Sequence, residues 1–375
     1  MISLVPTYIH ERKQWPGYRY DATAILPSLE RVTLARGRLF GILEAIGLDE
    51  KQEHDVAALT EELVKSSAIE GERLNPESVR SSVARRLGVE RGGLASSDHY
   101  VDGLVEMTLD AAHRYDLPLT ENRLFRWHAA LFPTGRNAYG PVSVGQWRTD
   151  EEGPMVVASQ KRGREIVHFV APHSDRVAHE MSQFLAWVED KNEESLILKA
   201  GIAHLWFETI HPLDDGNGRI GRNIMDLLLA RADQRSHRPY SMASQILAHR
   251  SDYYDMLEAT QKGNLDYTAW LNWYLMILHM TLDAATETVS QAIGRAQFWQ
   301  AAKDVPLNDR QRKAVSRMLM GWEGRMTNRK YASLCNCSTA TATRDLNDLV
   351  DKSILRPDGA GGRSTGYELV KPDSI

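Results

Sequence analysis

The sequence predicts a mainly α-helical fold, with one short β-hairpin in its larger part and a smaller unit of three helices and a second hairpin at its C-terminus. Two observations support this prediction. Apolar residues recur at the i, i+3, i+4 spacing of amphipathic helices along most of the 375 residues. Short apolar runs bounded by turn residues, which are typical of paired strands, occur at only two places.

The periodicity places these elements along the chain. Residues 1–21, rich in Trp, Tyr, Pro and Arg, look irregular, and a helix follows over 21–48. Further helices are predicted over 53–69, 76–87, 97–115, 120–132, 174–190, 195–210, 218–233, 248–262 and 266–296. The apolar runs 154–159 and 165–172, joined by the turn QKRGR, predict the hairpin.

The C-terminal residues, 305–375, predict a separate unit. LNDRQRKAVSRMLMGWEG indicates a helix closed by glycine, and a second helix follows the N-cap candidate Thr327. STATATRDLNDLVDKSI indicates a third, and LRPDGAGGRSTGYELV supplies two short strands around a Gly-rich turn. This order of elements resembles a winged helix-turn-helix domain. We therefore predict three regions: a leader and helix at 1–50, a main domain at 51–297 and this domain at 305–375.

The partner of the C-terminal unit is left open between two classes. Residues 305–375 hold 12 Lys and Arg against 8 Asp and Glu, which permits DNA contact. The third helix, however, carries Arg344 among Asp345, Asp348 and Asp351, and these acids disfavour phosphate. Docking to a protein, or formation of a homodimer, is the alternative.

The overall composition excludes several classes of protein. The net charge of −5 and the pI near 6.2 give no general nucleic-acid or membrane signature. The N-terminus lacks the apolar core of a signal peptide, and the most apolar helix, WLNWYLMILHM, is too short to span a bilayer. Cys335 and Cys337 are too few for a disulfide framework or a zinc site. We expect a cytoplasmic protein without membrane contact.

One stretch, HPLDDGNGRIGR at 211–222, concentrates chemically active residues. Gly216, Gly218 and Gly221 spell the dinucleotide fingerprint G-x-G-x-x-G, which works only after a strand and with an acid about 20 residues later. The preceding run LILKAGIAHLWFETI has helical periodicity, and RPYSMASQ near 240 contains no acid. A Rossmann nucleotide site is therefore excluded.

The stretch instead reads as a loop between two helices. The first helix ends near Ile210, because Pro212 disfavours helical geometry in the residue before it. The second begins near Gly218, and its free N–H groups and positive dipole end face the loop as an anion site. Arg219 and Arg222, three residues apart, share one helical face and can both reach phosphate oxygens.

Two further side chains give this anion site a chemistry. Asp215 offers a hard oxygen ligand for Mg²⁺, which usually binds one or two protein carboxylates together with substrate phosphates. His211 stands at the loop entrance and titrates near neutral pH, as a general base should. The set predicts attack on a nucleotide phosphate.

HPLDDGNGRIGR resembles the signature of Fic proteins, H-x-F-x-[D/E]-G-N-G-R-x-x-R, with Leu213 where the family usually has Phe. The resemblance implies an all-helical Fic core and a protein adenylyltransferase, which moves AMP from ATP to a Ser, Thr or Tyr hydroxyl of a target protein and releases pyrophosphate. A relative that phosphorylates has Lys at the position of Gly218, so glycine here favours AMP transfer. The target is a protein with a hydroxyl acceptor, which includes this chain itself.

The resemblance also implies the role of each motif residue. His211 would be the base, Asp215 would hold Mg²⁺, and Asn217 with the loop amides would contact the α-phosphate. Arg219 and Arg222 would hold the β- and γ-phosphates. The rest of the phosphate-binding loop would be Gly216, Gly218, Ile220 and Gly221.

The hairpin and the helix near residue 66 acquire roles in the same way. In Fic proteins such a hairpin, the flap, holds the target by strand addition, which points here to Val156, Val157, Ala158 and Ser159; a purely structural hairpin is the alternative. SSAIEG resembles the inhibitory motif [S/T]-x-x-x-E-[G/N], met by Ser66, Glu70 and Gly71. The resemblance implies that Glu70 pairs with Arg222 and blocks the γ-phosphate seat. The alternative is an ordinary helix end with Gly71 as its cap.

The segment HRSDYYDMLEATQKGN, 249–264, resembles the helix that follows the motif in the family. Tyr253 or Tyr254 and Gln261 would then lie near the adenine and ribose, although the family often has Asn at the last position; two tyrosines packed in a core are the alternative. His204, seven residues before His211, fits a core histidine better than a metal ligand.

Two rival functions use the same residues. One is a DNA-binding regulator whose Fic-like domain only senses nucleotide, which an intact His211 disfavours because binding alone needs no base. The other is a transferase that moves UMP or another phosphate-linked group through the same loop.

Overall fold

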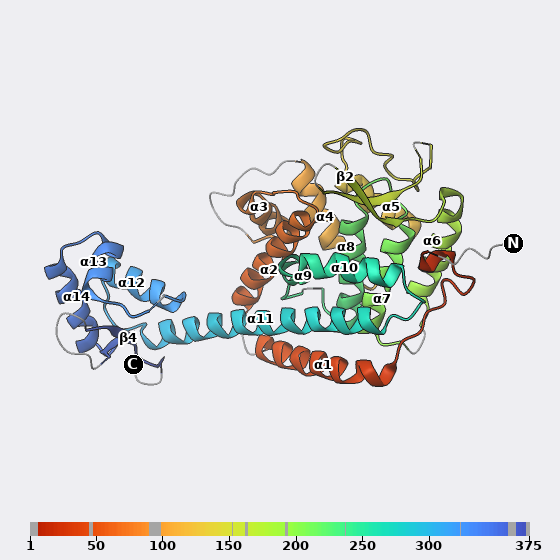
Figure 1. Ribbon diagram of the computed structural model, residues 1–375. Coiled ribbons are helices and arrows are strands. Elements are labelled where there is room, and N and C mark those ends of the chain that lie inside the picture. Colours follow the sequence, from red (N-terminus) through yellow and green to blue (C-terminus); the bar gives the residue numbers. More distant parts are fainter. Residues whose placement is uncertain are drawn as a thin grey trace. The chain divides into compact units, whose positions relative to one another are not determined.

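The computed structural model describes residues 7–44, 48–89, 99–151, 153–161, 164–191, 194–236, 238–322, 324–358 and 365–372. The chain divides into two compact units, Met1–Ala285 and Thr286–Ile375. Helices make up most of both units (Figure 1), and the prediction of a mainly helical fold is confirmed. Among the described residues, no helix combines the length and apolar character needed to cross a membrane.

The first unit follows the predicted order of elements. The 3-10 helix η1 (Ile9–Glu11) lies within the segment expected to be irregular. The other elements are α1 (Ala22–Glu44), α2 (Leu48–Ile69), α3 (Pro76–Arg86), α4 (His99–His113), α5 (Glu121–Leu131), β1 (Val156–Lys161), β2 (Arg164–Val170), α6 (Ser174–Glu189), α7 (Leu196–Ile210), α8 (Asn217–Asp233), α9 (Met242–Ala248), α10 (Arg250–Gln261) and α11 (Thr268–Ala301), which continues into the second unit.

One helix of this unit, α9, was not predicted. It has seven residues, too few for a helical repeat to stand out in the sequence. Its start is capped by Ser241, which accepts a hydrogen bond from the Ser244 N–H at 3.3 Å. Met242 and Ala243 are buried, and the Ala243 N–H donates to the Glu62 carboxylate of α2 at 3.1 Å. This short helix therefore helps to fix α2.

The centre of the unit is the pair α7 and α8. Residues 197–210 of α7 are all buried, as expected for a helix that is apolar on every side. Two glycines allow close packing around it: a Cβ on Gly201 would lie 2.7 Å from the Tyr274 ring, and one on Gly221 of α8 would lie 2.6 Å from the Glu208 carboxyl. The loop 211–216 that joins the two helices is therefore anchored at both ends in the core.

The predicted hairpin is present as β1 paired antiparallel with β2. Its register shifts between Val157 and Ala158, where the ladder contains an irregularity. Phe169 of β2 packs against Tyr8 and Ala171, and His10 is bonded through Nε2 to the Val170 carbonyl at 2.9 Å. The N-terminal segment thus supports one strand of the hairpin. The tip of the QKRGR turn lies partly outside the described residues.

The second unit contains α12 (Asp309–Leu319), α13 (Asn328–Cys335), α14 (Thr339–Asp351), β3 (Leu355–Pro357) and β4 (Tyr367–Leu369), in the predicted order. β3 and β4 pair antiparallel, and their Gly-rich connection lies outside the described residues. Asp345 of α14 is buried and accepts hydrogen bonds from Arg310 at 2.7 Å and from the Tyr331 hydroxyl at 3.0 Å. This acid, which was counted among those that disfavour phosphate, stabilises the unit's own interior. Cys335 and Cys337 are both free thiols.

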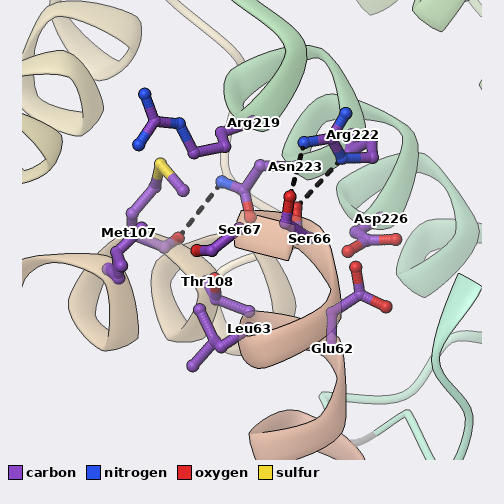
Figure 2. Close-up of a pocket in the computed structure, with 11 residues that line it drawn as sticks. Glu62, Leu63, Ser66, Ser67, Met107, Thr108, Arg219, Arg222, Asn223 and Asp226 are labelled. Atoms are coloured by element: carbon purple, nitrogen blue, oxygen red, sulfur yellow. Dashed lines mark hydrogen bonds between the residues drawn. The ribbon is translucent and has the colours of Figure 1, made fainter. Parts of the chain in front are cut away.

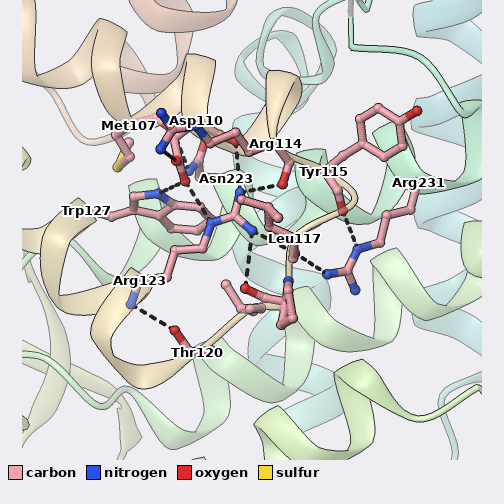
Figure 3. A network of polar contacts seen from close by, with 12 residues as sticks. Met107, Asp110, Arg114, Tyr115, Leu117, Thr120, Arg123, Trp127, Asn223 and Arg231 are labelled. Carbon is pink, nitrogen blue, oxygen red and sulfur yellow. Dashed lines mark hydrogen bonds and ion pairs between the residues drawn. The ribbon is translucent and has the colours of Figure 1, made fainter.

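A buried arginine ties α4 to α5 (Figure 3). The Arg123 Nε donates to the Asp110 carboxylate at 2.7 Å, and its other nitrogens donate to the carbonyls of Asp110, Arg114 and Leu117 at 2.8–2.9 Å. The Trp127 indole N–H donates to the same Asp110 carboxylate at 2.8 Å. The Arg123 side chain is 3% exposed, so the network replaces nearly all of its hydration.

We predict that Arg123→Ala lowers the free energy of unfolding by about 3–5 kcal/mol, because it leaves the Asp110 carboxylate and several carbonyls without their buried donor. The control is Arg114→Ala. Its side chain is 63% exposed and pairs with Asp110 at 3.4 Å, so this change should cost less than about 1 kcal/mol. Urea denaturation of both variants measures the difference, and equal losses would contradict the assignment.

Candidate active site

A cavity of about 690 Å³ brings together most of the residues singled out in the sequence. It lies between the 211–216 loop, the start of α8, the hairpin, α10 and the end of α2. The residues that line it and that were predicted from the sequence as site residues are Glu70, Val156, Val157, Ala158, Ser159, His211, Asp215, Gly216, Asn217, Gly218, Arg219, Tyr253, Tyr254 and Gln261. The other five predicted residues are not among those that line it: Ser66, Gly71, Ile220, Gly221 and Arg222.

His211 caps α7 in a left-handed conformation, with φ 50° and ψ 58°. Its Nδ1 lies 3.4 Å from the Glu208 carbonyl oxygen, which assigns the ring proton to Nδ1 and leaves Nε2 as the basic nitrogen. The buried Arg148 donates to the His211 carbonyl at 2.8 Å. Burial and, less strongly, the Arg148 charge lower the pKa of His211 to about 4, so the imidazole is neutral at pH 7. A neutral imidazole can accept a proton.

The two acids of the loop are held by hydrogen bonds. The Asn137 amide donates to the Asp215 carboxylate at 2.7 Å, and the Ser143 N–H donates to Asp214 at 2.9 Å. Both acids line the cavity. The described residues contain no group of three His, Cys, Asp or Glu side chains that could hold a metal ion alone. A lone carboxylate such as Asp215 fits Mg²⁺ that arrives bound to substrate phosphates.

Asn217 serves the loop itself. Its side-chain oxygen accepts from the Leu213 N–H at 3.0 Å, and its amide donates to the Leu213 carbonyl at 2.8 Å. Asn217 also lines the cavity, so its expected contact with the α-phosphate stays a prediction beside this loop-closing role. Leu213 is buried, as an apolar anchor should be. Gly216 precedes α8 with φ 81°, and a Cβ there would lie 2.5 Å from the Leu131 side chain.

The predicted contact between Glu70 and Arg222 is present. The guanidinium group of Arg222 donates to the Glu70 carboxylate at 2.8 Å and is only 1% exposed. Ser66 supplies two more acceptors, its hydroxyl to Nε at 3.0 Å and its carbonyl to Nη2 at 3.0 Å (Figure 2). Two residues of the SSAIEG motif, Ser66 and Glu70, therefore bind the second arginine of the 211–222 stretch. That Glu70 pairs with Arg222 is confirmed as a contact.

The end of α2 is shaped to present this carboxylate. Gly71 adopts φ 86°, and the Glu72 N–H returns to the Ser67 carbonyl at 3.0 Å, which is a Schellman-type helix end. The Ile69 carbonyl accepts from Arg250 of α10 at 2.7 Å and from the Tyr254 hydroxyl at 3.4 Å. Gly71 therefore ends the helix, and the same helix end carries the Glu70 carboxylate that pairs with Arg222.

Arg219 also has a carboxylate partner, which the sequence did not suggest. It donates to Glu72 at 2.9 Å and to the Tyr100 hydroxyl at 2.7 Å, and it lies 3.7 Å from Asp215. Its guanidinium group stacks over the Phe132 ring at 5.4 Å. Both motif arginines are thus neutralised by acids from the turn after α2.

A pair of buried acids, Glu62 of α2 and Asp226 of α8, lies below this contact (Figure 2). Arg238 bonds Asp226, and burial followed by the Asp226 charge raises the pKa of Glu62 to about 7. Between α2, α4 and α8 is a cavity of about 10 Å³, the size of one water molecule, with Ser66 and Arg222 in its wall. Polar residues therefore face α8 from Glu70, at the end of α2, back to Glu62, about two helical turns earlier.

The α10 residues form the opposite wall. Tyr253 is buried, and its hydroxyl is bonded to His204 Nε2 at 2.8 Å, which places His204 in the core as expected. The Gln261 amide donates to the Glu208 carbonyl at 3.3 Å. Tyr253, Tyr254 and Gln261 all line the cavity, and each also bonds to or packs against its neighbours, so their expected position near adenine and ribose stays a prediction.

The hairpin forms the remaining wall. β1 pairs with β2 on one edge, and no other described strand pairs with its second edge. The Ser159 hydroxyl is bonded to His168 Nε2 at 2.7 Å, and His168 Nδ1 is bonded to Glu258 of α10 at 2.7 Å. This chain of bonds ties the hairpin to α10 across the cavity mouth. The His168 side chain is 34% exposed.

Sequence reasoning missed five residues that support the site: Glu72, Asn137, Arg148, Glu208 and Arg250. Glu72 and Arg250 lie beside or within stretches that were singled out, 66–71 and 249–264, but nothing marked these two residues themselves, and Asn137 and Arg148 come from a segment without a recognisable pattern. Glu208 did carry a signal, because it is the only acid in the apolar run LILKAGIAHLWFETI.

We predict a strong thermodynamic coupling between Gly218 and Glu70. A Cβ on Gly218 would overlap the Glu70 carboxylate, so Gly218→Ala should lower the free energy of unfolding by about 1–3 kcal/mol. In the Glu70→Gly background the methyl group meets no carboxylate, and the same change should be neutral or stabilise by up to about 1 kcal/mol through helix propensity.

Urea denaturation of the four proteins gives the coupling energy. Gly37→Ala in α1, where a methyl group meets nothing within 4 Å, controls for the propensity gain. A Gly218→Ala effect of equal size in both backgrounds would mean that Glu70 does not occupy this position in solution.

Comparison with known proteins agrees with this site. A family model described as "Fic/DOC family" matches residues 118–229, and one described as "Domain of unknown function (DUF4172)" matches residues 8–89. A protein named "Protein adenylyltransferase Fic" in Culex quinquefasciatus is 25% identical over 276 residues, covering 66% of this chain and 50% of that protein. The protein of the same name in Drosophila virilis is 24% identical over 271 residues, covering 66% and 51%. The chain thus spans about half the length of these relatives.

Solved structures support the fold. A Fic family protein from Desulfovibrio desulfuricans G20 superposes with a TM-score of 0.54 at 21% identity, covering 93% of this chain and 97% of that one. A Fic domain containing signaling protein from Bacteroides thetaiotaomicron gives 0.51 at 17% identity, covering 69% and 97%. Residues 118–229, which include the 211–222 loop and most of α8, therefore form a Fic domain, and the chain is a homologue of Fic proteins.

Proposed function

We propose that this protein is an adenylyltransferase that moves AMP from ATP to a hydroxyl side chain of a target protein, and that Glu70 holds it in an inhibited state. The observation that carries the proposal is the position of His211 in the wall of a cavity that is also lined by the N-terminus of α8 and Arg219. The names of the relatives point to the same reaction.

In this proposal the chain's own residues divide the work. The N–H groups at the start of α8 and Arg219 would bind the phosphates. His211 Nε2 takes the proton from the acceptor hydroxyl, whose oxygen attacks the α-phosphorus. The bond from that phosphorus to the β-phosphate oxygen breaks, and pyrophosphate leaves with the electron pair. The product is an AMP ester of the target.

Asp215 would hold Mg²⁺ on the phosphates. The ion, when bound, neutralises charge on the triphosphate and on the leaving pyrophosphate. Asn137 would keep the Asp215 carboxylate directed at that ion, since its amide already donates to it at 2.7 Å.

The inhibition follows from Arg222. In the proposed active state this side chain binds the γ-phosphate, but here its Nη2 is bonded to Glu70 at 2.8 Å. ATP would then bind weakly or with its α-phosphate turned from in-line attack. A misplacement of about 1 Å can cost on the order of 10²-fold in rate. Inhibition therefore does not require that ATP be excluded.

We also propose that the second unit is a winged helix that recognises a macromolecular partner. Its order of three helices followed by an antiparallel strand pair supports this assignment. Asp345 is neutralised by Arg310 and Asp348 by Lys352 at 2.5 Å, so α14 presents less negative charge than its sequence suggests. DNA and a second protein remain the two partner classes. A regulator that only senses nucleotide, or a UMP transferase, would need the same cavity.

His211→Ala should abolish transfer while nucleotide binding persists. Loss of a general base costs about 10²–10⁴-fold in rate, whereas the anion-binding helix end is unchanged. Transfer is measured with ATP radiolabelled at the α-phosphate, and binding by calorimetry with the same protein. The comparison is made in the Glu70→Gly background, where the proposed inhibition is relieved, and transfer by the double variant at the rate of Glu70→Gly alone would remove His211 from the mechanism. Label from UTP exceeding that from ATP would favour the UMP transferase.

Glu70→Gly should raise the rate of AMP transfer, including transfer to the protein itself, above that of the wild type. The substitution removes the carboxylate and frees Arg222 for phosphate, so adding Arg222→Ala should suppress the gain. Glu106→Gln, which removes a well exposed carboxylate, is the control. Equal rates for wild type and Glu70→Gly, measured by intact mass after incubation with ATP and Mg²⁺, would show that Glu70 does not inhibit.

A further inference from the structure

Glu208 is an ionisable residue in the core of the protein that the proposed mechanism leaves without a task. It is the only acid of α7, a helix whose residues 197–210 are all buried, and it is itself 7% exposed. A buried carboxyl group costs free energy unless it is paired or hydrogen-bonded. One of its oxygens, Oε1, is buried and finds no hydrogen-bond partner among the described residues.

The carboxyl group lies directly behind the proposed base. Glu208 precedes His211 by one helical turn, and its Oε2 is 3.9 Å from His211 Nδ1. The Glu208 main-chain oxygen lies 3.4 Å from the same nitrogen. Glu208 therefore faces Nδ1 with both its main chain and its side chain, while Nε2 is left to the cavity.

The neighbouring helix leaves room for this carboxyl group. A Cβ at Gly221 would lie 2.6 Å from Glu208 Oε1 and 3.1 Å from His204 Nδ1. Any other residue at position 221 would push the carboxyl group aside. The glycine of the 211–222 stretch that does not line the cavity thus acquires a function, because it keeps the space that Glu208 occupies.

The charge of Glu208 depends on groups from four helices. Burial, and then the charge of Glu70 from α2, raise the pKa of Glu208 to about 8, and Arg222 of α8 opposes them. His204 and His211 of α7 and Tyr253 of α10 complete the titratable surroundings. With Glu70 in place the carboxyl group is mostly protonated at pH 7. Withdrawal of Glu70 removes a negative charge that opposes its ionisation.

We propose that Glu208 is a positioning residue for His211: its carboxyl group holds the imidazole from the Nδ1 side and, once ionised, stabilises the imidazolium that forms when Nε2 takes the acceptor's proton. The catalytic part of this inference rests on the proposed function. It adds a second effect of Glu70, because the carboxylate that blocks Arg222 also keeps the partner of the base uncharged. Inhibition then acts on phosphate binding and on proton removal together.

The positioning itself is tested without any transfer reaction. In the full-length protein with isotope-labelled histidines, nuclear magnetic resonance reports the tautomer and titration of His211, whose signals are those lost in His211→Ala. In the wild type we expect the Nδ1–H tautomer and a shift of the His211 signals as Glu208 ionises near pH 8. In the isosteric Glu208→Gln variant the step near pH 8 should vanish. Identical titrations and tautomers in the two proteins would overturn the inference.

The catalytic consequence is tested in the Glu70→Gly background. Glu208→Gln should lower kcat on the order of 10²-fold at an unchanged KM for ATP, and the rise of kcat with pH through the ionisation of Glu208 should disappear. Glu106→Gln should change neither quantity. An unchanged kcat and pH profile in Glu208→Gln would refute the catalytic role. If no variant transfers AMP, including Glu70→Gly alone, the proposed function fails, and the resonance titration still decides whether Glu208 positions His211.

Discussion

The buried guanidinium group of Arg222 is the constraint on which the site is organised. A cation that is 1% exposed must find a carboxylate and further acceptors, because the penalty for its dehydration is several kcal/mol. α8 supplies none of them at that point, and the end of α2 supplies all three through Ser66 and Glu70. The end of α2 therefore lies against α8 where it supplies the acceptors of the Arg222 guanidinium group. Gly218 accommodates the contact by having no Cβ where the Glu70 carboxylate lies.

The loop between α7 and α8 is rigid for reasons that are separate from this pair. Asn217 closes it from within by bonding both the N–H and the carbonyl of Leu213, and Arg148 holds the His211 carbonyl. Left-handed backbone at His211 and at Gly216 turns the chain sharply at each end. Such a loop presents its side chains with little freedom, and a preorganised base and helix end are what phosphoryl chemistry requires. The departure from the family signature at Leu213 leaves this intact, since an apolar side chain of either kind fills the same buried place.

The sequence was most informative where local patterns decide structure. Helical periodicity and polar caps placed the long helices to within a few residues, whereas η1, with three residues, and α9, with seven, were too short to be recognised. The 211–222 stretch and SSAIEG were recognisable because each function needs fixed residues at fixed spacing. The partners of those residues were not recognisable. Glu72 reaches Arg219, and Asn137 reaches Asp215, across long separations in the chain, and no local repeat encodes a contact that only the packed helices create.

In the proposed function, Glu70 and a γ-phosphate would compete for Arg222, so an activating signal would have to shift the equilibrium between these two contacts. A ligand shifts such an equilibrium only by its differential affinity for the two states, and under the proposed function ATP would have to displace a carboxylate that is already anchored. That anchor is the whole end of α2, because Arg250 holds the Ile69 carbonyl and Glu62 accepts from the Ala243 N–H. Weakening these supports would lower the cost of moving Glu70 without any change in the nucleotide site. The strength of the proposed inhibition therefore depends on how α2 packs against α8, α9 and α10. An activating partner would need only to stabilise a different position of α2.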